Sequence, residues 1–328
     1  MRTVRVPVTG GVRLAVDLWD GPGVGVGTVA FLLVHGLASN ARLWDGVAER
    51  LAQMGHAVAA VDQRGHGRSD KPDDGYDFAT VCDDLSQVLE SLAAGGAQPP
   101  DVWLRPVVVG QSWGANVVLE LAYRQPEALR GIACVDGGTI ELADAFDSWE
   151  ECAAAMTPPM LIGTPGSEME ALIRAMHPDW PESGVQGSLA NFELRADGTI
   201  APWLSLDHHL RILRFLWEHR PSTRYPAIKV PVLLVPADVA PAPAAALAAA
   251  LAAPDELAAP ADPAPDELAA PDDVAWAGEK HRSIDAALAA LANGRAHWFA
   301  PADHDIHAQF PVQLAELLHA SVTDGFLG

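Results

Sequence analysis

Residues 106–119 read Pro-Val-Val-Val-Gly-Gln-Ser-Trp-Gly-Ala-Asn-Val-Val-Leu. A run of β-branched residues ends in the pattern Gly-x-Ser-x-Gly, and apolar residues at helical spacing follow directly. A strand, a tight turn with Ser112 and a helix in this order predict a nucleophile elbow, which exposes a serine hydroxyl at the end of a strand. Gly110 and Gly114 lack the Cβ atoms that would collide where strand and helix fold back on each other. We therefore predict that Ser112 is a catalytic nucleophile.

On both sides of this turn, apolar runs alternate with helical patterns. The runs at residues 28–34, 57–61, 132–135, 230–235 and 296–299 predict buried strands, and helices are expected to begin near Asn40, near Val81 and at Pro311. Before them, residues 4–8 and 12–18 alternate between apolar and other side chains around Gly10-Gly11, which predicts an antiparallel hairpin. The predicted fold class is α/β, with a mostly parallel sheet, an N-terminal antiparallel hairpin and flanking helices.

Two segments interrupt this alternation. In residues 139–222 the strand signal lapses and Trp-rich, helix-like pieces take over, so we predict a helical cap between core segments 1–138 and 223–328. Residues 239–273 are mostly Ala and Pro with Asp and Glu, and one octapeptide occurs at both 253–260 and 264–271. Frequent prolines prevent a long helix there. We expect a flexible acidic insert whose deletion (243–272) leaves stability and activity nearly unchanged.

The amino-acid composition indicates which classes of binding partner are unsuited to this protein. The 328 residues carry a net charge of −22, which argues against a nucleic acid or an anionic membrane as partner. No apolar run has the length of a signal peptide or a membrane span, and Cys82, Cys134 and Cys152 are at no metal-ligand spacing. We predict a cytoplasmic protein with reduced, mostly buried thiols that acts on a small molecule; the oligomeric state is left open.

A serine nucleophile needs a base, and His304 has the best position among the twelve histidines. It lies directly after the last predicted strand and before the last predicted helix. Loops at the carboxyl ends of parallel strands are where ligand sites form in such sheets. The chain order, with the serine first and the histidine last, also matches an elbow enzyme. We therefore predict that His304 accepts the proton of Ser112.

The sequence resembles the α/β-hydrolase superfamily over nearly the whole chain. Four motifs carry the resemblance, and two of them are the elbow and His35-Gly36 after the first buried strand. The third, Asp62-Gln63-Arg64-Gly65-His66-Gly67-Arg68-Ser69, is similar to the family's Asp-x-Arg-Gly-x-Gly-x-Ser loop. The fourth, His304 with Gln309 and Pro311, is similar to a terminal His-x4-Glu-x-Pro with Gln in place of Glu. The resemblance implies an oxyanion hole made by the backbone N–H groups of Leu37 and Trp113. It also implies a substrate pocket lined at His35, Gly36 and His307, and no metal or cofactor.

The acid that orients His304 has two candidates. Asp238 follows strand 230–235, although the glycine of the family's usual Gly-x-x-Asp ending is missing. Asp136 follows the strand after the elbow helix, where some family members carry the acid. Asp303 and Asp305 flank the histidine too closely in sequence to orient its ring. We favour Asp238 and keep Asp136 as the alternative.

The predicted function is a serine hydrolase that cleaves a carboxylic ester or lactone of a small, largely apolar substrate through an acyl-enzyme. Ser rather than Asp at the elbow argues against epoxide hydrolases and haloalkane dehalogenases. Two alternatives stay open. Proline iminopeptidases share the Trp after the nucleophile, which is compatible with an aminopeptidase, and the same fold also serves small-molecule receptors that turn over slowly or not at all.

Overall fold

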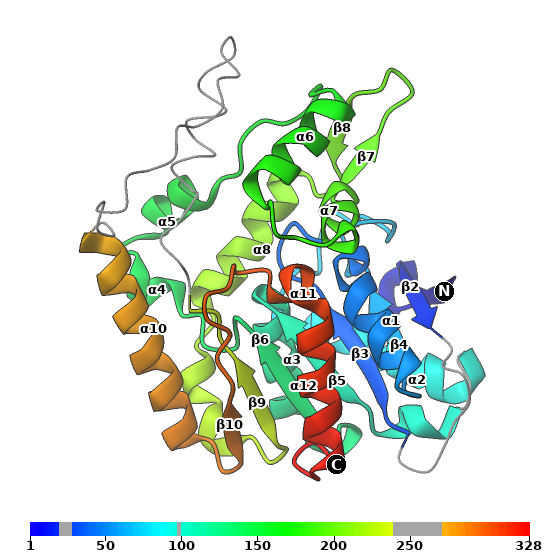
Figure 1. Ribbon diagram of the computed structural model, residues 1–328, viewed down its shortest axis with the longest axis vertical. Helices are drawn as coiled ribbons and strands as arrows, with labels where there is room; N and C mark the ends of the chain where they lie inside the picture. Colours follow the sequence, from blue (N-terminus) through cyan, green and yellow to red (C-terminus); the bar gives the residue numbers. More distant parts are fainter. Residues whose placement is uncertain (20–27, 97–99, 239–270) are drawn as a thin grey trace.

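An eight-stranded sheet between two layers of helices forms the body of the protein (Figure 1). The computed structural model describes residues 1–19, 28–96, 100–238 and 271–328. The strand order is β1-β2-β4-β3-β5-β6-β9-β10; β1 and β2 pair antiparallel, as do β2 and β4, and every later pair is parallel. The strands are β1 (Arg2–Pro7), β2 (Arg13–Trp19), β3 (Ala30–Val34), β4 (Ala57–Val61), β5 (Val107–Gln111), β6 (Gly131–Val135), β9 (Val232–Val235) and β10 (Gly294–Ala296).

The parallel strands β3, β4, β5, β6 and β9 bury both of their faces because helices cover the sheet on both sides, whereas the edge strand β10 is partly exposed. Leu32 of β3 packs in one apolar cluster, and its neighbour Leu33 packs in the other. The first cluster contains side chains of α2 (Phe78–Ser91), α3 (Trp113–Arg124) and α10 (Pro271–Ala290). The second contains side chains of α1 (Asp45–Gln53) and α12 (Pro311–Thr323).

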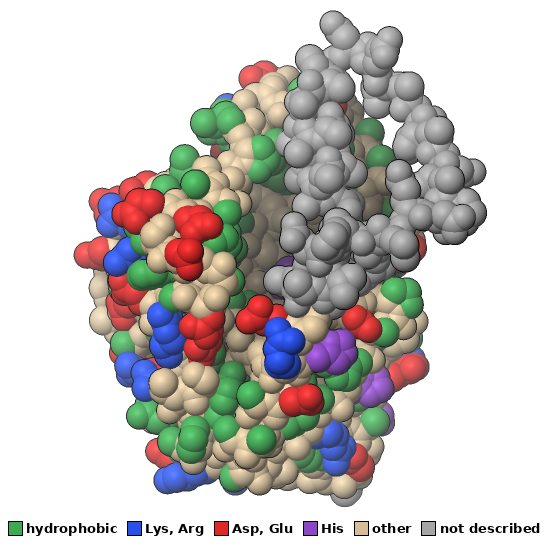
Figure 2. All heavy atoms as spheres, turned by 90° about the vertical axis from the view of Figure 1, so that its left-hand side faces the viewer, with side chains coloured by type: hydrophobic (Ala, Val, Ile, Leu, Met, Phe, Trp, Pro, Cys, Tyr) green, Lys and Arg blue, Asp and Glu red, His purple; other side chains and the backbone are tan. Residues whose placement is uncertain are grey.

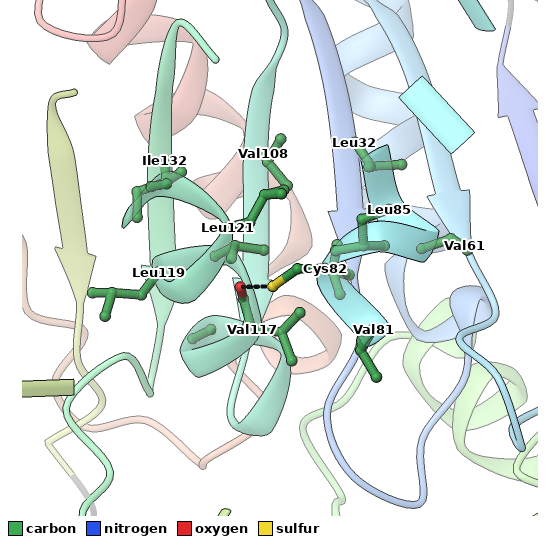
Figure 3. Close-up of a cluster of buried hydrophobic side chains, with 14 of the residues drawn as sticks. Leu32, Val61, Val81, Cys82, Leu85, Val108, Val117, Leu119, Leu121 and Ile132 are labelled. Atoms are coloured by element: carbon green, nitrogen blue, oxygen red, sulfur yellow. Dashed lines mark hydrogen bonds between the residues drawn. The ribbon is translucent and has the colours of Figure 1, made fainter. Parts of the chain in front are cut away.

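The contact between α2 and α3 shows how tightly the elbow helix is held. Figure 3 shows Cys82 of α2 directed toward Val117 of α3, with Val81 and Leu85 in the same apolar cluster. The Cys82 thiol donates to the Val117 carbonyl at 3.6 Å. Because both ends of this contact are fully buried, α3 has little freedom to move relative to the sheet. All three cysteines are free and buried, as expected from the sequence.

The predicted fold class is confirmed, and most element positions agree with the sequence patterns. The N-terminal hairpin pairs Val4 with Val16 and Val6 with Leu14. One strand begins earlier than predicted: β10 covers Gly294–Ala296 instead of residues 296–299, and Phe299 joins the sheet only through a single bridge to Ala237.

Residues 136–231 connect β6 to β9, and between residues 142 and 218 this connection contains mostly helix, as the sequence predicts. The helices are α4 (Leu142–Ala145), α5 (Trp149–Met156), α6 (Gly166–Met176), α7 (Glu182–Leu189) and α8 (Leu206–Glu218). The expectation of no strand here was wrong, because β7 (Phe192–Leu194) and β8 (Ile200–Pro202) form a small hairpin. Its turn uses Asp197, which caps Thr199, and Gly198 at φ 84°. The division at residues 138 and 222 stays a prediction.

Two further expectations concern parts of the chain that are described only in part. Most of the predicted acidic insert, residues 239–270, lies outside the described residues. Among the helices that are described, none has both the length and the apolar character needed to cross a bilayer. The cytoplasmic location stays a prediction.

Candidate active site

Ser112 occupies the turn between β5 and α3, at the carboxyl edge of the sheet. Its backbone has φ 54° and ψ −124°, a conformation that costs energy for any residue other than glycine. The surrounding structure fixes this turn: Ser112 N–H donates to Val135 O at 3.0 Å. A Cβ on Gly114 would collide with the carbonyls of His35 and Val34, so glycine is required for the close approach. The predicted elbow geometry is therefore present.

The loop after β3 lies directly against the serine. A Cβ on Gly36 would be 3.1 Å from Ser112 Cβ and 2.5 Å from Gln111 Oε1, so this glycine lets the loop touch the elbow. In the part of the chain that is described, neither the Leu37 nor the Trp113 N–H donates to another group. Trp113 begins α3, so its N–H also lies at the positive end of a helix dipole. Both donors suit the oxyanion hole expected from the sequence.

Two buried histidines hold the conformation of that loop. His35 Nδ1 donates to Gly36 O at 2.7 Å, and His35 Nε2 accepts from Gln63 N–H at 3.0 Å. His66 Nε2 accepts from Ala38 N–H at 3.2 Å. Burial lowers the pKa of both rings, which keeps them neutral and able to accept these hydrogen bonds. Since Ala38 N–H is used by His66, the adjacent Leu37 N–H is the one left for a ligand.

His304 meets a carboxylate from a different strand end. The structure places His304 Nδ1 2.6 Å from Asp136 Oδ2. Asp136 comes directly after β6 with φ 40°, and its own N–H donates to Val235 O at 2.9 Å. Its other oxygen, Oδ1, accepts from Ala237 N–H at 2.9 Å and from Lys280 Nζ at 2.9 Å. The side chain of Asp136 is 4% exposed, whereas that of His304 is 51% exposed.

These contacts set the charge states of the pair. Burial would raise the pKa of the Asp136 carboxyl, but the His304 hydrogen bond and the positive charges of His304 and Lys280 lower it below its usual value. Burial of the ring would lower the pKa of His304, and the hydrogen bond and charge of Asp136 raise it. Together with the charge of Asp305, these effects of Asp136 outweigh the desolvation, so the pKa of His304 lies above its usual value. Asp136 is therefore ionised and ready to stabilise a protonated His304.

The preference for Asp238 as the partner of His304 does not agree with this geometry. Asp238 is joined to its surroundings through its backbone, donating to Phe299 O at 2.8 Å and accepting from Ala302 N–H at 3.1 Å. Among the described residues its carboxylate forms no hydrogen bond with the His304 ring. The β9 strand ends at Val235, so Asp238 lies beyond the sheet edge, while Asp136 follows its strand directly. Asp136, the alternative, occupies the position facing the ring.

Gln111 ties the histidine loop to the elbow. Its Nε2 donates to the His304 carbonyl at 3.2 Å, and its buried side chain also contacts Gly36. No hydrogen bond joins Ser112 Oγ to the His304 ring within the described chain. Such bonds between nucleophile and base are often long until the substrate binds. Gln111 thus brings the loop of the base beside the serine.

The predicted pocket role of two histidines needs correction. His307 is fully buried and packs on Trp44, with ring centroids 4.4 Å apart. Burial lowers the pKa of His307 to about 3, so the ring stays neutral. His35 is also fully buried and supports the loop as described above. Of the three predicted pocket residues, only Gly36 lies against the nucleophile.

The segment between α6 and α7 contacts the histidine loop through Asp303. Its carboxylate accepts from Trp180 Nε1 at 2.9 Å and lies 3.2 Å from His177 Nδ1. The Asp303 N–H donates to Gln309 Oε1 at 2.7 Å, and Gln309 Nε2 donates to Asp179 at 2.6 Å. Gln309, which replaces the family's Glu, therefore links the loop of the base to the segment between α6 and α7.

Two members of this site were missed from the sequence. Gln111 fell inside the elbow motif as an unspecified residue, and its only signal is a polar side chain at the end of an apolar strand. Lys280 follows the acidic segment on α10 and belongs to no motif. Its role depends on a contact across 144 positions of the chain, which spacing along the sequence does not reveal.

In the described part of the chain, no cluster of His, Cys, Asp and Glu could hold a metal ion.

Comparison with known proteins gives the same fold. Residues 29–160 match the family model described as alpha/beta hydrolase fold. A 2-(acetamidomethylene)succinate hydrolase of Mesorhizobium japonicum is 28% identical over 174 residues, which cover 53% of this chain and 58% of that protein. Epoxide hydrolase A of Mycobacterium tuberculosis is 33% identical over 135 residues, covering 40% of this chain and 38% of that protein.

A solved structure extends the likeness to the whole chain. The crystal structure of E-2-(acetamidomethylene)succinate hydrolase has a TM-score of 0.67 at 20% identity, and the match covers 99% of both chains. The matched parts of the two curated relatives amount to less than two thirds of their own length. The family model, the strand order and the elbow agree with one another. The chain therefore has the alpha/beta hydrolase fold, and residues 29–160 match the model of that family.

Proposed function

We propose that the protein is a serine hydrolase that cleaves a carboxylic ester or lactone of a small, largely apolar substrate through an acyl-enzyme. The observation that carries this proposal is the 2.6 Å contact between Asp136 and His304, in a loop tied to the Ser112 elbow by Gln111. An ionised carboxylate, an imidazole and a serine in this order are the parts needed for nucleophilic attack on a carbonyl carbon.

The mechanism follows from the groups present. His304 takes the proton of Ser112 as its oxygen attacks the carbonyl carbon, and Asp136 stabilises the imidazolium that forms. The N–H groups of Leu37 and Trp113 stabilise the oxyanion. The imidazolium then gives its proton to the leaving alcohol. A water molecule, activated by His304, releases the acid and restores Ser112.

Several features support the ester class. The named relatives are hydrolases, and apolar side chains dominate the cluster between cap and core. This cluster comprises Leu43, Met169, Ile173, Trp180, Val185, Ile200 and Ala308. Epoxide opening through a covalent intermediate needs a carboxylate at the elbow, and this chain carries Ser112 there. An ester also has a better leaving group than an amide, so it places the smallest demand on proton transfer.

Ser112→Ala tests the nucleophile. Turnover of p-nitrophenyl acetate, butyrate and octanoate should fall by about 10³-fold or more, because removing the nucleophile of a triad leaves only residual catalysis. Ser222→Ala, at an exposed serine, should turn over like the wild type. A fluorophosphonate should label Ser112 alone when peptides are read by mass spectrometry.

The outcomes separate the classes of function. Equal ester hydrolysis by the wild type and Ser112→Ala would refute the assignment of the nucleophile. Turnover of proline p-nitroanilide without ester turnover would favour an aminopeptidase. Saturable binding of an ester with neither turnover nor labelling would favour a receptor.

A further inference from the structure

A cation from outside the serine–histidine–aspartate set contacts the acid. Lys280 of α10 places its Nζ 2.9 Å from Asp136 Oδ1 and 3.2 Å from Asp136 Oδ2. The same ammonium donates to the Ala237 carbonyl at 3.0 Å, while the Ala237 N–H donates to Asp136 Oδ1. The ammonium, the carboxylate and the backbone N–H and C=O of Ala237 thus form a closed ring of hydrogen bonds, and the lysine side chain is 14% exposed.

This ring restricts the rotation of the Asp136 carboxylate. Oδ2 faces His304, and Oδ1 faces the Ala237 N–H. Because Lys280 reaches both oxygens, rotating the carboxylate about its Cβ–Cγ bond would break contacts on both sides. Charge-assisted hydrogen bonds of this kind are stronger than neutral ones. The lysine therefore contributes to holding Oδ2 where the imidazole meets it.

The same cation acts on the proton affinity of the base. The Lys280 ammonium and a protonated His304 ring would both contact the Asp136 carboxylate, and two positive charges this close together repel each other. Lys280 therefore disfavours protonation of His304. The titratable groups around His304 come from β6, α10, the cap and its own loop. They are Asp136, Lys280, His177, Asp303, Asp305 and His307. Lys280 is the cation in this set that touches the acid directly.

We propose that Lys280 is a positioning residue: it fixes the Asp136 carboxylate toward His304 and lets the imidazole lose its proton at a lower pH than Asp136 alone would allow. This role deepens the proposed function, and its expected effect on turnover rests on that function. Figure 2 views the molecule from the side on which Figure 1 draws α10, and basic side chains (Lys or Arg) lie among acidic ones there.

The test is an NMR titration of the His304 ring, assigned with a His304→Gln variant. In Lys280→Met, the pKa of His304 should rise by about one pH unit, because a full charge is removed within about 6 Å of the ring. Lys280→Arg should keep the value within about 0.3 units, since the charge is retained. Lys229→Met removes the same charge from an exposed residue before the start of β9, at the opposite end of that strand, and should leave the titration unchanged.

A folded Lys280→Met protein with the wild-type His304 titration would overturn the proposal. If Lys280→Met does not fold, Lys280→Gln provides the same test, because the amide keeps hydrogen-bond donors without the charge. On an accepted ester, the acidic limb of kcat/KM should move to higher pH in both neutral variants and return in Lys280→Arg. A wild type without any turnover would refute the proposed function, and the titration would still decide the role of Lys280.

Discussion

At the scale of single residues, the position of each carboxylate indicates which aspartate orients His304. Asp136 has four hydrogen-bonding contacts. They come from His304, from Ala237 N–H and twice from Lys280. A buried carboxylate with this many donors stays ionised at neutral pH. It therefore fits the task of orienting the imidazole and stabilising its protonated form.

Asp136→Asn should lower kcat by about 10⁴-fold, as in the serine-protease example of this substitution, because the imidazole then adopts the wrong tautomer. Asp238→Asn should change kcat little, since Asp238 meets its neighbours through its backbone. Steady-state rates on one accepted ester measure both variants, and circular dichroism checks their folding. A larger loss in Asp238→Asn than in Asp136→Asn would reverse the assignment.

The pH profile gives an independent check on the same pair. Asp136 raises the pKa of His304 although burial lowers it, and the base must be neutral to accept the Ser112 proton. The acidic limb of wild-type kcat/KM should therefore lie above the ordinary imidazole value of about 6.5. In Asp136→Asn the limb should move to lower pH, because the charge that favours the imidazolium is lost. A loss of rate with an unchanged limb would point to misfolding.

At the scale of elements, a buried ion pair fastens the loop after β4 to α2. Arg64 donates to Asp84 through two nitrogens, at 2.6 and 2.8 Å, and both side chains are almost fully buried. Arg64 also reaches the Asp74 carbonyl at 3.3 Å. The loop in question carries His66, which supports the oxyanion segment, so the pair links packing to the site.

Arg64→Met should lower the free energy of unfolding by about 3–5 kcal/mol, because it leaves the Asp84 carboxylate buried without its partner. Arg174→Met is the matched control, since that arginine pairs with Glu170 and Glu182 at the exposed surface. It should have no measurable effect. Urea unfolding of both variants decides the question.

The double variant Arg64→Met/Asp84→Leu sharpens this experiment. Removing both charges also removes the unpaired carboxylate, so most of the lost stability should return. A loss of less than about 1 kcal/mol in Arg64→Met alone would mean that water or another group satisfies Asp84.

Elements were predictable from the sequence wherever local pattern and tertiary packing agree. Apolar runs such as Phe31–Val34 are long enough to mark buried strands, and the glycines of the elbow mark its turn. The hairpin of β7 and β8 was missed because its strands have only three residues each, too few to show an alternating pattern. The sequence left two candidates for the acid because Asp136 and Asp238 both follow strands, and the structure places Asp136 against the His304 ring. Which of the two carboxylates faces the His304 ring depends only on the register in which β6, β9 and β10 pair.

At the scale of the whole molecule, buried histidines couple stability to pH. Burial lowers the pKa of six rings below the ordinary value: His35, His56, His66, His208, His209 and His307. As the pH falls, these rings bind protons in the unfolded chain but stay neutral in the native protein. Their contribution to stability is therefore complete above about pH 6.5 and is lost as the pH falls below it. His304, with its raised pKa, acts in the opposite direction.

His307 gives the sharpest test, because burial lowers its pKa to about 3 and neither ring nitrogen has a partner among the described residues. Between pH 8 and pH 5.5 this ring alone should remove about 1.4 kcal/mol of stability, which follows from its unfolded pKa of about 6.5. In His307→Phe that part of the pH dependence should vanish, since the phenyl ring takes up no proton. Urea unfolding at the two pH values measures the change, and pH 5.5 stays above the isoelectric point of about 4.7. His297→Phe, at an exposed site, should keep the wild-type dependence. If His307→Phe loses as much stability as the wild type between the two pH values, the native ring already takes up its proton in this range and its burial does not keep it neutral.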